Sequence, residues 1–203
     1  MTYPLCIDVQ VFESPVFHNG GNSHAFISSF FDDDFKLPEV IALLHRWLGA
    51  AFSRRSRLEK KDMIQLAYLK EKYCRLIEAA ATLSEYASNQ EDSLENEVSL
   101  LEPRDMIANM KRGLDLWDSF PRYLSRVEII NPYHALRECF DYKAPGEWCR
   151  FLEELYEAAG NRRSVAELSA EPDLYYVCCN LFKLLEACHL IKIKRRHGSA
   201  NGK

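Results

Sequence analysis

The chain has 203 residues, of which 47% are hydrophobic and 28% charged, and its formal net charge at pH 7 is −4. This length and balance are typical of a globular protein with one domain, or one domain and a small appendage. The acidic excess argues against non-specific binding of nucleic acid, which usually depends on a surplus of Lys and Arg.

The N-terminal region is predicted to form a β-hairpin. Hydrophobic and polar residues alternate over residues 5–12, as in a half-buried strand, and residues 18–23 are rich in turn-forming types. Residues 24–31 contain the aromatic and β-branched types that favour a second strand. Because a lone hairpin is only marginally stable, we expect residues 1–36 to be an appendage that packs on the rest of the chain or pairs with another chain.

From residue 37 to residue 194 the sequence predicts a mainly α fold, a bundle of about six helices. The strongest pattern lies between residues 58 and 87, where apolar residues recur at alternating spacings of three and four. This spacing is typical of an a/d seam, so one long helix should pack lengthwise along a partner helix. The seam consists of Leu66, Leu69, Tyr73, Leu76, Ala80, Leu83 and Ala87.

Several start and stop signals place the other helices. Pro38 and Pro103 each suit a first helical position, and Asn131 followed by proline predicts a helix to about Tyr142. A further amphipathic helix should end at Gly160. The segment 172–193 is apolar nearly all round, which predicts a helix in the centre of the bundle. The polar residues 195–203 are predicted to be a disordered basic tail.

The chain has seven cysteines, an odd number, and most of them lie in apolar runs. The sequence contains no CxxC motif. Free thiols in such runs behave as small hydrophobic groups, so we expect a reducing, intracellular environment without a disulfide framework. The N-terminus lacks the basic region of a signal peptide. No apolar run reaches the ~18 residues of a membrane span. Together these features predict a cytoplasmic protein without membrane contact.

One predicted helix carries a dense polar face. His134, Arg137 and Glu138 share this face with Asp141, because their spacings are three, four and seven. Such a group can act as general acid and base or grip a phosphate, and Arg126 lies just upstream. The candidate catalytic residues are therefore Arg126, His134, Arg137 and Glu138. The alternative, which we favour, is a solvated helix face with ordinary ion pairs.

Histidines and aspartates near the N-terminus are possible metal ligands. His18 and His24 flank a glycine turn, and three aspartates follow at residues 32–34. This spacing matches no metal motif, and acidic residues before a helix commonly complement its dipole. The sequence also contains neither GxSxG nor the glycine-rich loops that cradle phosphates. We therefore predict no metal and no cofactor.

Two basic clusters are candidates for a nucleic-acid patch. Arg54, Arg55 and Arg57 precede the long helix, and Arg195 and Arg196 follow the last one. If the fold brings the clusters together, they could hold a phosphate backbone. Basic residues are expected at the end of a helix but not near its start, so the first cluster is the more informative.

These observations support three hypotheses. The first is a non-enzymatic interaction domain that binds a protein partner or self-associates, based on the seam, the open hairpin edges, the missing catalytic motifs and the aromatic residues near helix ends. The second is a helical protein that binds nucleic acid or cleaves RNA. The third is a small-ligand pocket in the bundle, lined by Tyr175, Tyr176 and Trp148.

Overall fold

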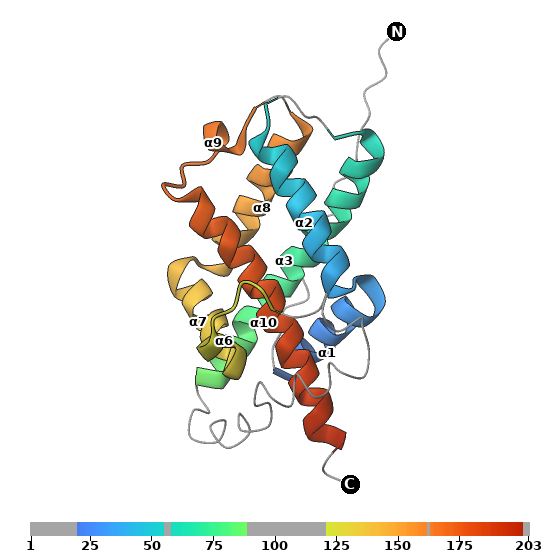
Figure 1. The fold of residues 1–203 in the computed structure, drawn as a ribbon, viewed down its shortest axis with the longest axis vertical. Helices are drawn as coiled ribbons and strands as arrows, with labels where there is room; N and C mark the ends of the chain where they lie inside the picture. Colours follow the sequence, from blue (N-terminus) through green and yellow to red (C-terminus); the bar gives the residue numbers. More distant parts are fainter. Residues whose placement is uncertain (1–19, 55–57, 89–120, 162, 201–203) are drawn as a thin grey trace.

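The computed structural model describes residues 20–54, 58–88, 121–161 and 163–200, and these residues form an elongated bundle of helices (Figure 1). The predicted mainly α class is therefore confirmed. The elements are α1 (Gly20–Ser29), a π-helical turn η1 (Phe30–Asp34), α2 (Leu37–Phe52), α3 (Lys60–Ser88), α6 (Arg126–Ile130), α7 (Pro132–Tyr142), α8 (Pro145–Gly160), α9 (Val165–Leu168) and α10 (Leu174–Ala200).

The second strand of the predicted hairpin is wrong, because residues 24–31 lie in α1 and η1. In α1 the buried residues are Gly20, Ser23 and Ile27, a helical spacing that turns one face towards α3. Packing of this face outweighs the local preference of aromatic and β-branched residues for strands. Ile27 and Phe30 are fully buried in the same core as the later helices. The first predicted strand, residues 5–12, lies outside the described residues.

Helix α3 confirms the predicted seam. Each seam residue from Leu66 to Ala87 is at most 3% exposed. The expectation of one partner helix is not met, because α3 packs against α1, α7 and α8. With 29 residues it is much longer than any of these three, so several shorter helices are needed to cover its apolar face.

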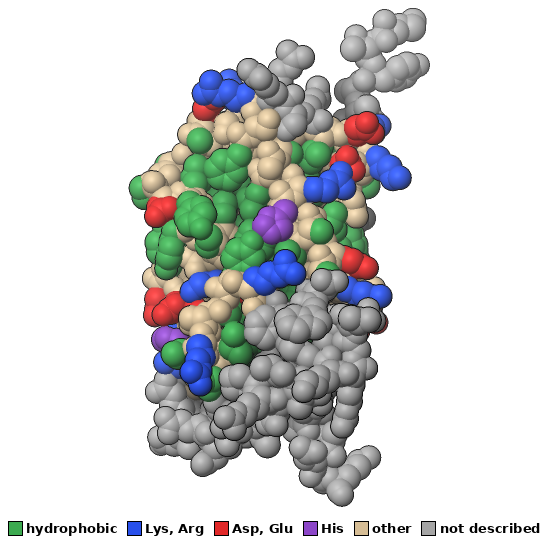
Figure 2. Space-filling model, in the orientation of Figure 1, with side chains coloured by type: hydrophobic (Ala, Val, Ile, Leu, Met, Phe, Trp, Pro, Cys, Tyr) green, Lys and Arg blue, Asp and Glu red, His purple; other side chains and the backbone are tan. Residues whose placement is uncertain are grey.

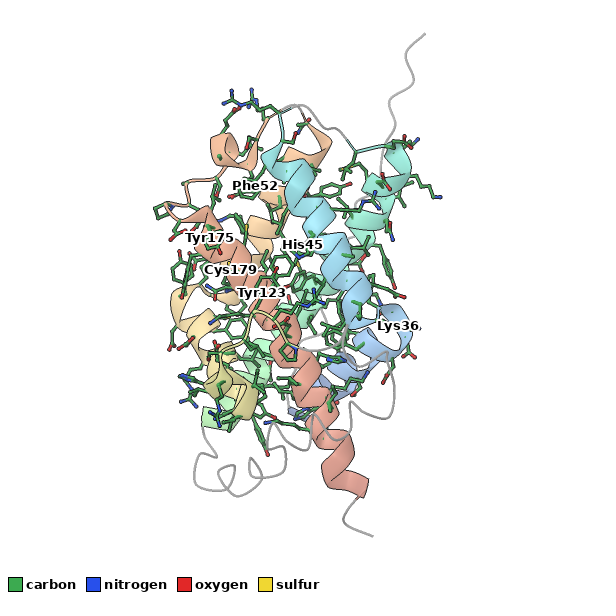
Figure 3. All side chains as sticks on the ribbon, in the orientation of Figure 1. Lys36, His45, Phe52, Tyr123, Tyr175 and Cys179 are labelled. Atoms are coloured by element: carbon green, nitrogen blue, oxygen red, sulfur yellow. The ribbon has the colours of Figure 1, made fainter. Side chains whose placement is uncertain are left out.

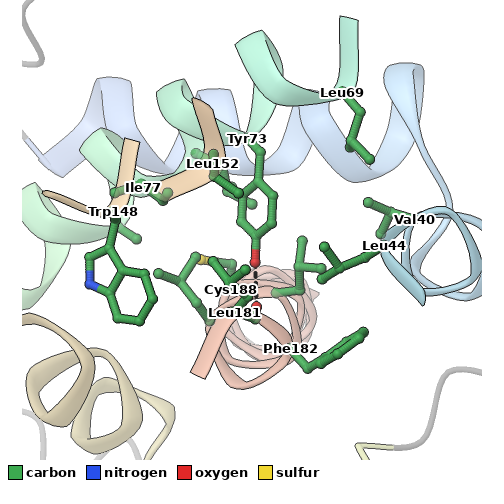
Figure 4. Packing of buried hydrophobic residues seen from close by; sticks show 14 of the residues in the cluster. Val40, Leu44, Leu69, Tyr73, Ile77, Trp148, Leu152, Leu181, Phe182 and Cys188 are labelled. Atoms are coloured by element: carbon green, nitrogen blue, oxygen red, sulfur yellow. Dashed lines mark hydrogen bonds between the residues drawn. The ribbon is translucent and has the colours of Figure 1, made fainter. Parts of the chain in front are cut away.

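Helix α10 occupies the centre of the bundle, as its all-round apolar sequence predicted. It packs against α1, α2, α3, α6 and α7. The Tyr73 hydroxyl of α3 reaches across the core and donates a hydrogen bond to the carbonyl of Leu181 (Figure 4). The helix continues to Ala200, past residue 194, where the sequence predicted the polar tail to begin.

By length and composition, Leu174–Arg195 of α10 is one segment in the described part of the chain that could cross a membrane. In the bundle, 67% of its most apolar stretch is buried against other helices. The core helix of a helical bundle has the same composition, since every side must face apolar neighbours.

The helix boundaries read from the sequence are confirmed around α7 and α8. The Asn131 side chain accepts a hydrogen bond from the Tyr133 N–H at 3.2 Å, so it caps α7, which ends at Tyr142. Helix α8 ends at Gly160, as predicted. The helix predicted from Pro103 lies outside the described residues.

Candidate interaction surface

One face of the bundle carries a group of exposed aromatic side chains. Figure 2 shows hydrophobic side chains gathered over α2, α9 and α10. Exposed fractions are 40% for Phe52, 39% for Tyr142, 80% for Tyr175 and 42% for Tyr176, and Tyr123 is half-buried. Figure 3 shows Phe52, Tyr123 and Tyr175 on the same side of the molecule, and Tyr142 contacts Tyr176, the residue after Tyr175. We call these five residues the aromatic surface. Large apolar groups that gather on one face, instead of lying scattered, mark an interaction site.

Three rings, of the exposed His45, the half-buried Tyr123 and the buried Phe182, stack together at this surface. The Tyr123 ring lies nearly parallel to the Phe182 ring, with centroids 4.4 Å apart, and the His45 ring lies 4.5 Å from Phe182. The Tyr123 hydroxyl and His45 Nε2 are 3.1 Å apart, within hydrogen-bond distance. His45 comes from α2 and Phe182 from α10, so the stack joins two helices and the segment that contains Tyr123 (Figure 3).

A buried carboxylate holds Tyr123 in this position. Glu186 of α10 is 0% exposed and accepts hydrogen bonds from the backbone N–H groups of Arg122, Tyr123 and Leu124, at 2.7, 2.8 and 3.2 Å. Burial raises the pKa of Glu186, and the three N–H donors offset part of that rise. The segment before α6 is thus fixed to the central helix. In the sequence, the contact of Glu186 with residues 122–124 is indicated only by the position of this glutamate within an apolar segment.

Neighbouring contacts fix the rest of the aromatic surface. The rings of Tyr142 and Tyr176 meet edge to face, with centroids 4.9 Å apart. The Ser164 hydroxyl donates a hydrogen bond to the carbonyl of Phe52 at 3.2 Å, which fixes the end of α2 next to α9. The rings of Tyr123, Tyr142 and Tyr176 are therefore held in place before any partner binds, so binding would order few of these side chains.

Three of the candidate catalytic residues, His134, Arg137 and Glu138, lie on α7, and two of them form an ion pair. His134 Nε2 lies 3.4 Å from Glu138 Oε1, and these side chains are 43% and 48% exposed. Arg137 lies on the same helix and is half-buried, while Arg126 is exposed at the start of α6. An i,i+4 pair this open to solvent has the geometry of an ordinary helix-surface ion pair.

A more buried ion pair lies beneath this face. Lys183 Nζ of α10 is 2.5 Å from Glu128 Oε1, and the Glu128 side chain is only 2% exposed. Burial would raise the pKa of Glu128, but the Lys183 ammonium and the Ser125 hydrogen bonds lower it below its ordinary value. Glu138 lies farther from Lys183, at 3.8 Å. The pair joins α6 to α10, and sequence patterns did not reveal it because the partners are 55 residues apart.

We expect Lys183→Met to lower the free energy of unfolding by about 2 kcal/mol at pH 7, because it leaves the Glu128 carboxylate buried without its cation. The lowered pKa of Glu128 means that its contribution is present above the ordinary value of 4.5 and is lost as the pH falls through the folded-state pKa. The difference between variant and wild type should therefore shrink in acid. Urea unfolding at pH 7 and pH 3.5 measures both effects.

The matched control for Lys183→Met is Glu138→Gln, which removes the longer contact with Lys183 and the solvent-exposed pair with His134. We expect no change in its unfolding midpoint. If Lys183→Met also leaves the midpoint unchanged at both pH values, the Glu128 pair is screened like a surface pair and does not join the helices.

The described members of the two basic clusters, Arg54 and Arg195, lie far apart (Figure 1). Arg54 follows the end of α2 and pairs with Glu167 at 2.5 Å, whereas Arg195 lies near the C-terminal end of α10. Those helix ends lie at opposite ends of the molecule (Figure 1). Arg55 and Arg57 lie outside the described residues, as does the side chain of Arg196. The described residues therefore form no joint patch from both clusters.

The aspartates considered as metal ligands each contact a different group. Asp32 pairs with Lys192 at 2.6 Å, Asp33 accepts a hydrogen bond from Ser29, and Asp34 pairs with Lys72 at 3.0 Å. Burial, and in addition the positive charge of Arg195, lower the pKa of His24 to about 4. His18 lies outside the described residues. Within the described chain, the three carboxylates do not converge on one point.

The proposed ligand pocket is wrong in its lining residues. Trp148 is fully buried in the core, while Tyr175 is 80% exposed and Tyr176 is 42% exposed. The three residues therefore do not line one enclosed cavity, because the tyrosines face outward from the first turn of α10.

No family model, no curated protein sequence and no solved structure matches this chain. The function is therefore inferred from the geometry of the aromatic surface and of the contacts beneath it.

Proposed function

We propose that this chain is a non-enzymatic, cytoplasmic interaction domain that self-associates through the aromatic surface. The exposed aromatic side chains on α2, α7 and α10 are the observation that supports this proposal. Tyrosine is favoured at protein interfaces because it offers a large apolar ring and a polar tip on a side chain with few rotatable bonds.

The chemistry of this surface suits contact with a second copy of the same chain. A two-fold interface places the same patch on both subunits. A charged side chain near the two-fold axis would therefore face the same charged side chain of the other subunit and be repelled by it. The aromatic surface consists of Phe and Tyr only, which carry no charge at neutral pH. A tyrosine hydroxyl is both donor and acceptor, so it can pair with its own copy.

The proposal predicts concentration-dependent mass. Light scattering across a dilution series should show a mass near twice the monomer value of 23.6 kDa at high concentration, falling towards that value on dilution. Tyr175→Glu should raise the dimer dissociation constant at least tenfold, because it places two like charges in the contact. Tyr175 is the most exposed of the aromatic groups, so this substitution leaves the core intact.

The matched control is Ile64→Glu, which introduces the same charge at a 65% exposed apolar residue of α3 outside the aromatic surface. We expect it to leave the dissociation constant unchanged. A constant monomer mass at every concentration would overturn the proposal. The same series with a short mixed RNA at low salt tests the alternative function, since a mass increase that depends on RNA would indicate nucleic-acid binding.

A further inference from the structure

Two cysteines on neighbouring helices face each other across the contact between α3 and α8. Cys149 of α8 lies with its Sγ 3.9 Å from the carbonyl oxygen of Cys74 in α3. Both residues are half-buried, whereas Cys139 and Cys188 are buried in the core.

Two neighbouring contacts show that Cys74 lies opposite Cys149 in the packing of α3 against α8. Lys70, four residues before Cys74, pairs with Glu153, four residues after Cys149. Farther along, the Met63 side chain lies so close to Gly160 that a β-carbon there would be 2.9 Å from its methyl group. The two helices are therefore antiparallel, and each cysteine is the residue opposite the other.

From this juxtaposition we propose that Cys74 and Cys149 are a peroxide-sensitive dithiol, which forms a reversible disulfide joining α3 to α8. The proposal does not depend on the proposed self-association. The other described cysteines offer poorer pairs: Cys178 and Cys179 are adjacent in one helix and point in different directions, and Cys139 and Cys188 are buried in the core away from oxidant. A disulfide needs two β-carbons about 3.8 Å apart, which opposite positions at a close helix contact favour, and rotation of the two side chains then brings the sulfur atoms together.

The two thiols have different roles in this reaction. The contact with the Cys74 side chain lowers the pKa of Cys149, while the same contact and burial raise the pKa of Cys74. Cys149 is thus the better thiolate and Cys74 the resolving thiol. Partial exposure of both residues gives a small oxidant access that the core cysteines lack.

Hydrogen peroxide supplies the oxidising equivalents. The Cys149 thiolate attacks one peroxide oxygen, the O–O bond breaks, and the leaving hydroxide takes up a proton as water, so Cys149 becomes a sulfenic acid. The Cys74 sulfur then attacks the Cys149 sulfur, an S–S bond forms, and the S–O bond breaks. The Cys74 proton leaves with that oxygen as a second water molecule. Two thiols are oxidised by two electrons, and one peroxide is reduced to two water molecules.

The test treats the reduced full-length chain with hydrogen peroxide, blocks remaining thiols and maps tryptic peptides without reductant. We expect a mass loss of about 2 Da per disulfide and a cross-linked pair of peptides, residues 73–75 joined to residues 144–150. Dithiothreitol should restore both peptides. The melting temperature should rise by about 5–10 °C on oxidation, since the link closes a long loop in the unfolded chain.

Two variants separate this link from general oxidation. Cys149→Ser should abolish the joined peptides and the melting shift, while Cys179→Ser, at another half-buried cysteine, should keep both. If peroxide converts Cys149 to sulfinic acid without a link, or joins other cysteines first, the proposal is overturned. Peptide mapping of the wild-type chain distinguishes these outcomes even if a variant does not fold.

Discussion

Glu186→Ala is expected to lower the free energy of unfolding by about 3 kcal/mol. Glu186 is fully buried and receives three backbone N–H donors from residues 122–124. Alanine leaves these donors without an acceptor beside the central helix, and an unsatisfied buried donor costs about 1–3 kcal/mol. The three donors lie on one short segment, which can move into solvent and bind water. The expected loss is therefore smaller than three times the cost of one unsatisfied donor.

Urea unfolding followed by circular dichroism measures this loss. The control is Glu157→Ala on the exposed side of α8, for which we expect an unchanged midpoint. Glu186→Gln should be milder than alanine, because its amide oxygen still accepts from the segment. A loss of less than 1 kcal/mol for alanine would contradict this prediction and mean that water replaces the carboxylate.

The same substitution tests how the aromatic surface is built. The N–H of Tyr123 is one of the three donors, and its ring stacks on Phe182. If the carboxylate positions this ring, Glu186→Ala should weaken self-association in the absence of denaturant, where the protein is still folded. An unchanged dissociation constant in the folded variant would show that the stack holds Tyr123 without Glu186.

Trp148→Ala is expected to lower the free energy of unfolding by about 4 kcal/mol. Trp148 of α8 is 0% exposed, and its indole N–H donates to the carbonyl of Cys139 in α7 at 3.2 Å. Truncation removes the apolar contacts of a large ring, leaves a cavity at the junction of α7 and α8, and removes this hydrogen bond. Calorimetric or urea unfolding measures the loss.

Trp148→Phe keeps most of the ring and should cost less than half as much, because only the indole N–H and part of the volume disappear. Ile64→Ala is the exposed control and should stay within about 0.5 kcal/mol of wild type. A loss under 2 kcal/mol for Trp148→Ala would mean that the neighbouring helices collapse into the space.

Periodicity was enough to predict most of the helical framework. The seam from Leu66 to Ala87, the asparagine cap before α7 and the apolar helix α10 all follow from spacings of three and four or from local capping chemistry. These signals act within a few turns of one helix, so they can be read without knowing the fold. Residues 24–31 show the limit, since their composition favours a strand while packing against α3 makes them helical.

Local patterns in the amino-acid sequence are enough to predict helices around one central apolar helix, because spacing and capping signals act within a few turns and repeat along the chain. The long-range contacts become visible in the folded chain alone: Glu186 with residues 122–124, Lys183 with Glu128, and Cys74 with Cys149. Each of these contacts joins residues more than 50 positions apart. Their partners depend on how the helices cross, which is set by the packing of the whole core and not by any local pattern.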